Sequence, residues 1–248
     1  MNNIVFEKAK NISQNIILGN ICGSNLFCTN DSNSDIDINY FIMPTKTDLV
    51  RNRMQRYLMY SDKCDISIFD IRYLLHFVCD GDINKLFLLF NENDMYINQN
   101  YKQFIDVILD KREKLASDIS KNIYDFGKRF FELKMSKLHY FKEIEECYQK
   151  YDYNTKNVAQ AIMMLKIIYK YFENVNYNID NPMLQSFNYR LEIRDEILSI
   201  KHGKYTEKQI LDIANDEYSK YNAINFVTVN NNMGWFNQII YQLIESDI

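Results

Sequence analysis

The chain has 248 residues, of which 47% are hydrophobic and 25% are charged, so it has enough apolar material for a folded core and is not expected to be disordered. Six glycines and two prolines are few for this length, which argues against turn-rich β-sandwiches and against glycine-rich nucleotide loops. The formal net charge of −4 excludes the strong basic field of a protein that coats nucleic acid.

The five cysteines do not form a recognisable metal or disulfide pattern. There is no C-x-x-C pair and the three histidines lie far apart, so we expect reduced thiols and no structural zinc. The first residues lack a basic segment followed by an apolar run, and no apolar stretch is long enough for a bilayer. We therefore expect a cytoplasmic protein with no signal peptide and no membrane partner.

Residues 1–97 are expected to alternate between short strands and short helices. Polar and apolar residues alternate over 35–43, as along a half-buried strand, and Pro44 ends the pattern. The same alternation occurs over 64–69, and the apolar run over 15–22 has the length and β-branched content of a strand. Helices are expected at 4–14, 71–79 and 84–90, and a linking segment at 48–60.

Helical periodicity dominates the chain from about residue 98 onward. The expected helices cover 101–131, 133–151, 157–172, 193–199, 206–221 and 235–244. Thr206 followed by Gln209 indicates a capping box, and Gly203 indicates a helix end. The predicted fold is α+β, with a small mixed-sheet domain at 1–97 followed by an all-α domain at 98–248.

Three aspartates stand at the starts of two predicted strands. Strand alternation places Asp35 and Asp37 on one face, and Asp65 opens the next strand. Neighbouring carboxylates repel unless a cation lies between them, and oxygen ligands suit Mg²⁺ or Mn²⁺. A third carboxylate would complete a two-metal site able to align a hydroxyl, a phosphate and a leaving group.

Gly23 and Ser24 follow the first predicted strand. Gly23 would let the backbone approach a triphosphate closely, and Ser24 offers a hydroxyl and an N–H at a predicted helix start. Alone, an Asp-x-Asp pair is usually a solvated strand face, and Gly-Ser is weaker still. Asp70 competes with Asp65 for the third position, or simply caps the next helix. The order of the three motifs along successive strand ends is what favours a site.

These residues resemble the Gly-Ser and Asp-x-Asp pattern of the DNA polymerase β-like nucleotidyltransferase superfamily. Three blocks are similar in order to bacterial and phage predicted nucleotidyltransferases associated with RNA repair ligases. The blocks are 23–44, 65–90 and 195–218, the last containing an "IK-x-G" segment. The resemblance implies a nucleotidyltransferase core whose cleft is completed by the helical domain, in the cytoplasm of a bacterial cell or a phage-infected host.

The resemblance implies transfer of a nucleoside monophosphate from an NTP to an acceptor hydroxyl, with RNA (a tRNA or an RNA end) as the acceptor. It implies a site for two ions of Mg²⁺ or Mn²⁺. Three carboxylates would bind these ions and act in catalysis. These are Asp35, Asp37 and Asp65. The nucleotide-binding residues that it implies are Gly23, Ser24, Lys156 and Lys201. Lys201 is equally consistent with a solvated helix end, and Lys156 could also face the cleft.

Several accessory positions depart from the family pattern. An arginine and a glycine are replaced by Asn25 and Cys28, and an acidic residue by Phe87. A histidine and an arginine of a later helix are replaced by Gln160 and Met163. These changes favour an alternative, a catalytically weakened relative that binds nucleotide or a partner as a regulator, such as a phage counter-defence factor. A helical nucleic-acid adaptor with incidental aspartates is a third hypothesis.

Overall fold

The computed structural model divides the chain into two compact units. The sheet unit comprises Met1–Asn122 and Val229–Ile248, and the helical unit comprises Ile123–Thr228. The residues that the structure describes are 4–5, 7–8, 15–32, 34–61, 63–139, 150–225 and 233–247. The division falls after Asn122, not after residue 97 as expected.

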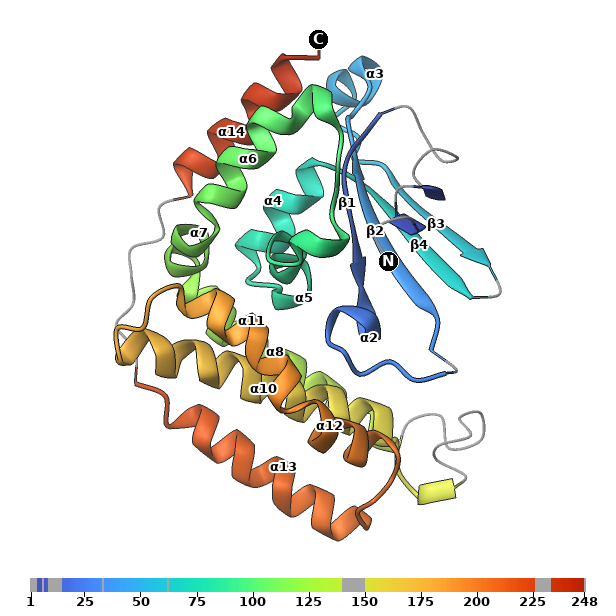
Figure 1. The fold of residues 1–248 in the computed structure, drawn as a ribbon, viewed down its shortest axis with the longest axis vertical. Coiled ribbons are helices and arrows are strands. Elements are labelled where there is room, and N and C mark those ends of the chain that lie inside the picture. The colour runs from blue at the N-terminus through green and yellow to red at the C-terminus, as the bar shows by residue number, and fades with distance from the viewer. Residues whose placement is uncertain are drawn as a thin grey trace. The chain divides into compact units, whose positions relative to one another are not determined.

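The described residues of the sheet unit form a five-stranded mixed sheet, which confirms the α+β prediction (Figure 1). Its strand order is β3-β4-β2-β1-β5, and only β2 and β4 pair in parallel. The strands are β1 (Ile16–Cys22), β2 (Ile36–Ile42), β3 (Arg56–Ser61), β4 (Cys64–Asp70) and β5 (Tyr96–Ile97).

Three of these strands, β1, β2 and β4, are the predicted ones. The expected link at 48–60 contains most of β3 and the end of a helix, α3 (Lys46–Val50). β3 was missed because four consecutive apolar residues, 57–60, replace the alternation of a one-sided strand, and all four are exposed at the sheet edge. A strand at an edge need not bury one face selectively, so its sequence carries little periodic signal.

The two faces of the sheet differ in chemistry. One face is an apolar core that includes Ile21, Ile38, Tyr40 and Ile66, and Val5 packs on it. The Tyr40 hydroxyl donates a hydrogen bond to the Val5 carbonyl. Of the helix expected at 4–14, residues 4–5 and 7–8 are helical and the rest lie outside the described residues.

The opposite face is polar at one end and aromatic at the other. Cross-strand pairing puts the side chains of Asp37, Asn39 and Phe41 of β2 level with Asp65, Ser67 and Phe69 of β4. Short helices cover this face, with Phe69 touching the aromatic rings of Tyr73 and Phe77. The covering helices are α4 (Arg72–Cys79) and α5 (Ile83–Leu86), followed by a 3₁₀ turn at Phe87–Leu89.

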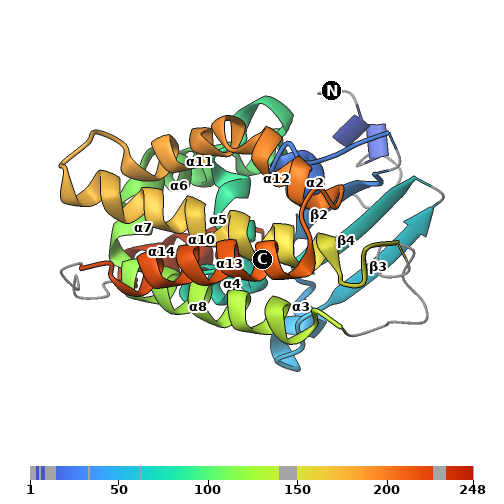
Figure 2. The ribbon, with the colours of Figure 1, turned by 90° about the horizontal axis from the view of Figure 1, so that it is seen from below.

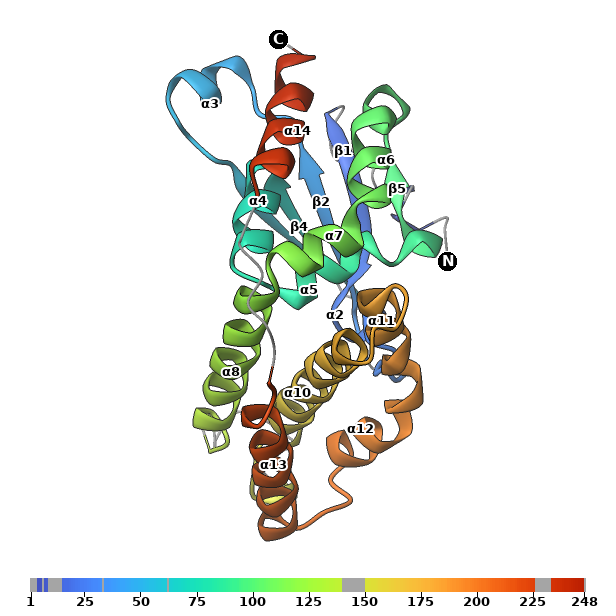
Figure 3. The same ribbon diagram turned by 90° about the vertical axis from the view of Figure 1, so that its left-hand side faces the viewer.

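The C-terminal helix returns to the sheet unit. α14 (Gly234–Glu245) packs against α4 and α6 (Figure 3). The Trp235 indole N–H donates to Asp118 Oδ2 at 2.9 Å, and the Tyr101 hydroxyl donates to Asp247 Oδ1 at 2.8 Å. Apolar periodicity predicts such helices but not the element against which they pack. The expected domain boundary at residue 97 therefore differs from the observed one at Asn122. The neighbouring elements are 3₁₀ turns at Glu92–Asp94 and Gln99–Tyr101, then α6 (Lys102–Asp110) and α7 (Arg112–Asp118).

The helical unit is built around one long buried helix. α10 (Thr155–Asn176) packs against three other helices, and most of its aliphatic side chains are buried (Figure 2). The packing helices are α11 (Pro182–Glu192), α12 (Arg194–Lys201) and α13 (Glu207–Asn222). α8 (Ser120–Ser136) enters the unit and stacks Phe131 on Tyr218. Much of the helix predicted at 133–151 lies outside the described residues.

Two predicted helix signals in this unit are confirmed, and one helix was missed. Thr206 and Gln209 form the capping box at the start of α13. Gly203, at φ +70°, closes α12 with hydrogen bonds from its own N–H to Ile200 and from the Lys204 N–H to Ser199, the Schellman arrangement. α11 was not predicted, although Pro182 occupies its first turn as helices favour. Within the described part of the chain, no helix is both long and apolar enough to span a membrane.

Candidate functional site

The turn after β1 lies against the Asp37 carboxylate. Gly23 has φ +61°, and a Cβ built on it would stand 1.9 Å from Asp37 Oδ2. Cys22, the last residue of β1, pairs directly with Asp37 of β2. Glycine is therefore required here by both backbone conformation and space. The approach of this backbone to a triphosphate stays a prediction, and the group that lies close to Gly23 in the structure is the Asp37 carboxylate.

Ser24 and Asn25 continue this turn as part of the single-turn helix α2 (Gly23–Leu26). The Ser24 carbonyl accepts a hydrogen bond from the Thr29 N–H at 2.9 Å. The Asn25 side-chain amide donates to the Asp35 carbonyl at 2.9 Å. Asn25, one of the departures from the family pattern, thus ties the Gly-Ser turn to the residue that precedes β2.

Asp37 and Asp65 are direct neighbours across the parallel β2–β4 pair. Both are half-buried and project from the same face, where two like charges destabilise each other unless a cation or donor compensates them. Asp35 lies just before β2 and is exposed. The structure therefore brings two of the three predicted carboxylates together and leaves the third at the entrance to the strand.

This donor set fits a hard divalent cation. Carboxylate oxygens are the ligands that Mg²⁺ and Mn²⁺ prefer, and the Asp37–Asp65 pair supplies them from rigid strands. Among the described residues, no three His, Cys, Asp or Glu side chains converge closely enough to bind a metal ion. Asp37 and Asp65 could hold one ion, whereas a second ion would need Asp35 to turn toward them.

Lys85, a half-buried lysine of α5, lies on the same face of the sheet as Asp37 and Asp65. The Lys85 ammonium lies 5.1 Å from the centre of the Phe69 ring and 5.3 Å from that of Phe77. Burial lowers the pKa of Lys85, and the nearby negative charges of Asp82 and, to a smaller extent, Asp37 oppose that shift. Burial also raises the pKa of the Cys22 thiol to about 12, so Cys22 is a neutral neighbour of Asp37.

Asp70 serves a structural role at the other end of β4. Its side chain is fully buried, and both of its oxygens accept hydrogen bonds from the Arg72 guanidinium, at 2.9 and 2.5 Å. Asp70 Oδ1 also accepts from the Arg72 backbone N–H, which begins α4. Ile71, and not Asp70, occupies the N-cap position of α4, so the expected cap is one residue off. The Arg72 guanidinium already engages the Asp70 carboxylate.

Lys156 and Lys201 belong to the helical unit, where the start of α10 and the end of α12 are hydrogen-bonded to each other. The Thr155 hydroxyl donates to the Lys201 carbonyl at 2.8 Å, which joins the start of α10 to the end of α12. The Gly203 turn packs on the Tyr151 ring, where an added Cβ would come within 2.3 Å. Lys156, at the start of α10, and Lys201, at the end of α12, therefore belong to neighbouring helix ends.

The remaining departures fall into two groups. Cys28 has φ +58°, a left-handed conformation that favours the glycine of the family pattern. Phe87 and Met163 are buried core residues, and Phe87 contacts the rings of Phe27 and Phe90. Side chains buried in this way cannot replace an acidic or basic ligand-binding group. Gln160 is half-buried on α10.

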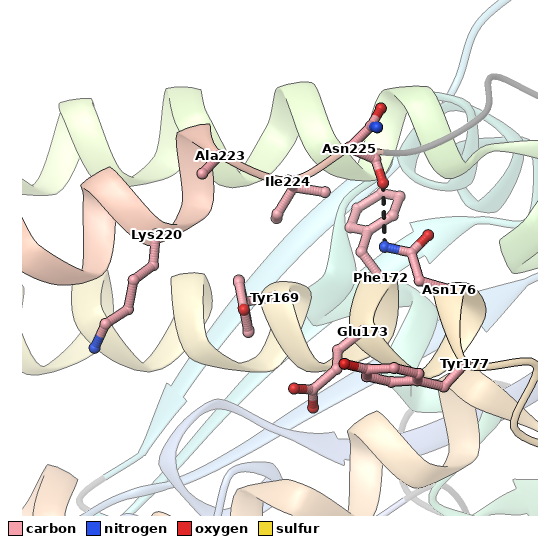
Figure 4. A pocket seen from close by; sticks show the side chains of 9 residues that line it. All are labelled: Tyr169, Phe172, Glu173, Asn176, Tyr177, Lys220, Ala223, Ile224 and Asn225. Atoms are coloured by element: carbon pink, nitrogen blue, oxygen red, sulfur yellow. Dashed lines mark hydrogen bonds between the residues drawn. The ribbon is translucent and has the colours of Figure 1, made fainter.

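A cavity of about 440 Å³ in the helical unit contains none of the predicted residues (Figure 4). Three of its polar side chains already have partners. Asn176 donates to the Asn225 carbonyl at 3.1 Å, Lys220 pairs with Asp216, and Glu173 pairs with Lys170. We therefore do not assign it a role.

Two site residues were missed at the sequence level, Lys85 and Asn39. Lys85 is a single cation inside the mostly apolar segment 84–90, which is predicted only as a helix. Its position within that run is the signal that could have identified it. No protein-family model matches the chain, and no curated protein matches it significantly.

Proposed function

We propose that the protein is a metal-dependent nucleotidyltransferase that transfers a nucleoside monophosphate from an NTP to a hydroxyl of RNA, either a tRNA or an RNA end. The observation that carries this proposal is the packing of Gly23 on Asp37, with Asp65 level with Asp37 on the next strand. Three sequence motifs that are separated along the chain thereby meet at one end of the sheet.

The proposed chemistry is an in-line displacement at the α-phosphate. The acceptor oxygen forms a bond to the α-phosphorus, the bond from that phosphorus to the bridging oxygen breaks, and pyrophosphate leaves with the electron pair. A divalent ion, when bound, would neutralise charge that develops on the phosphate oxygens. Asp37 and Asp65 would hold the ion, and an Asp65 oxygen could accept the proton of the acceptor hydroxyl.

Gly23 and Ser24 would bring the backbone of the α2 turn beside the phosphates, as the resemblance implies. Lys156 and Lys201 are the proposed nucleotide contacts from the helical unit. Burial of the Asp37–Asp65 pair against the sheet would limit water around the ion, which strengthens its attraction for phosphate oxygens.

A second candidate function is a weakened relative that binds nucleotide or a partner without turnover. It is favoured by the exposed position of Asp35 outside β2 and by the burial of Phe87 and Met163 in the cores. Such a protein would keep the Asp37–Asp65 cation site and lose the accessory groups that drive transfer.

One experiment separates the two candidates. The protein is incubated with each α-labelled NTP, Mg²⁺ or Mn²⁺ and total RNA, while calorimetry measures NTP binding in the same buffers. Label transferred to RNA supports the transferase. NTP binding with no transfer to any acceptor supports the second candidate, and the absence of both contradicts the proposed site.

A further inference from the structure

A half-buried lysine without a direct ion pair lies on the face that carries Asp37. The ammonium of Lys85, on α5, lies 5.1 Å from the centre of the Phe69 ring and 5.3 Å from that of Phe77. Among the described residues, no carboxylate lies within 4.0 Å of its ammonium. The charges of Asp82 and Asp37 offset part of the cost of burying this cation without a direct ion pair to it. A cation held in this way is a candidate for binding a ligand.

A second cation flanks the same aromatic ring. Arg56 of β3 pairs across the strands with Phe69, and its guanidinium carbon lies 5.4 Å from the ring centre. Arg56 is exposed and, within the described part of the chain, also lacks an ion pair. The positive charge of Arg56 disfavours that of Lys85. An anion that contacts both cations would relieve this repulsion.

A buried donor on this face also lacks an acceptor. The Asn39 side chain is 2% exposed, and its Nδ2 makes no hydrogen bond among the described residues. Asn39 is level with Ser67, between the positions of Asp37 and Phe41. The donors and the carboxylates thus share one face, with Phe69 about 13 Å along β4 from Asp65 at the usual strand rise.

We propose that Lys85 and Arg56, which both lie against the Phe69 ring, form a subsite that binds a phosphate group of the substrate. Phosphate suits the site because it is compact and its oxygens can accept hydrogen bonds from both cations. Phosphate is also part of the NTP and of the RNA acceptor in the proposed reaction. The inference deepens the proposed function, on which it rests for the nature of the ligand. The phosphate could belong to the triphosphate of the NTP or to the backbone of the acceptor strand.

The test compares Lys85→Met, Lys85→Arg and Arg56→Gln with the wild type in excess Mg²⁺. Binding is measured to ATP in one arm and to a short single-stranded oligouridylate in the other. Lys111→Met is the matched control, because Lys111 also lies 5.3 Å from an aromatic ring, that of Trp235, but belongs to the α6–α7 junction.

We expect Lys85→Met to weaken binding in at least one arm by about tenfold, as the loss of a charge-assisted contact predicts. Arg56→Gln should weaken the same arm by about threefold because its head is solvated. Lys85→Arg should retain most of the affinity, and Lys111→Met should change it less than twofold. A loss in the ATP arm assigns the phosphate to the NTP, and a loss in the oligouridylate arm assigns it to the acceptor strand.

The subsite is rejected if the wild type binds neither probe, or if Lys85→Met and Arg56→Gln bind both like the wild type. If Lys85→Met does not fold, Arg56→Gln and Lys85→Arg decide alone. Label transfer is assayed in parallel. If the wild type transfers label but the variants bind both probes as the wild type does, only the subsite is rejected. If the variants bind a probe more weakly but the wild type transfers no label, only the transferase is rejected.

Discussion

Replacing Gly23 by alanine tests whether the turn after β1 is shaped by the Asp37 carboxylate. The added Cβ would stand 1.9 Å from Asp37 Oδ2, 2.8 Å from its Cγ and 3.1 Å from its Cβ. The carboxylate would have to move by about 1.5 Å to reach the shortest ordinary contact of 3.4 Å. Such a movement takes Asp37 away from its position level with Asp65.

Two costs add in this variant. The left-handed backbone at φ +61° costs about 1–2 kcal/mol for any residue with a Cβ. Displacing the half-buried carboxylate adds a further cost of about 1–3 kcal/mol. Gly23→Ala should therefore lower the free energy of unfolding by about 2–5 kcal/mol, and it should abolish label transfer.

A double-mutant cycle isolates the second cost. In an Asp37→Ala background the carboxylate is absent and only the contact of 3.1 Å with the Cβ of residue 37 remains. Gly23→Ala should then cost little more than the backbone part, about 1–2 kcal/mol. Urea unfolding followed by circular dichroism measures all four proteins. Equal costs of Gly23→Ala in both backgrounds would refute the claim that Asp37 requires glycine at this turn.

Three further predictions concern the surroundings of the site. Cys28→Gly should raise the free energy of unfolding by about 0.5–1 kcal/mol, because glycine relieves the left-handed strain at φ +58°; a decrease in urea unfolding would contradict this. The Cys22 thiol, with its pKa raised by burial from 9.0 to about 12, should be alkylated much more slowly in the native protein than in urea at pH 9, as peptide mapping can measure. Its contribution to stability is complete below pH 9 and should be lost as the pH rises toward 12; native and unfolded rates that agree would count against burial. Asp118→Ala removes the acceptor of the Trp235 indole and should destabilise the protein by about 1.5–3 kcal/mol, with faster amide exchange in α14; unchanged exchange would show that α14 is held by other contacts.

The inner strands β1, β2 and β4 could be predicted from the sequence, whereas the edge strand β3 could not. β2 and β4 alternate polar and apolar residues because one face meets the apolar core and the other carries the site. β3 pairs on one side only, and its residues 57–60 are all exposed, so nothing constrains their period. Tertiary pairing with β4 decides that this segment is a strand.

Helices could be predicted as helices but not assigned to a unit. α6, α7 and α14 have apolar stripes that suit any apolar partner, and the contacts that place α14 beside α4 and α6 come from far along the chain. Specific bonds such as Trp235 to Asp118 join residues more than a hundred positions apart. A sequence pattern contains no such pairing information.

The parts of the candidate site that could be predicted are those whose position in the sheet follows from the order of the motifs along the chain. Gly23, Asp37 and Asp65 stand at strand ends that the topology brings together, so motif order sufficed. Asp35 depends on where β2 begins, and strand boundaries are the least determined feature of a sequence. Lys85 was missed because its importance comes from burial against Phe69, which only packing reveals.

The most direct test of the central claim is label transfer from α-labelled NTP to RNA by four proteins side by side. These are the wild type, Asp37→Asn, Asp65→Asn and the matched control Asp110→Asn, which changes an exposed aspartate at the end of α6. We predict Mg²⁺-dependent transfer by the wild type and the control, and its loss by at least about a hundredfold in the two site variants while all four remain folded. Transfer by Asp37→Asn and Asp65→Asn at the wild-type rate would contradict the account.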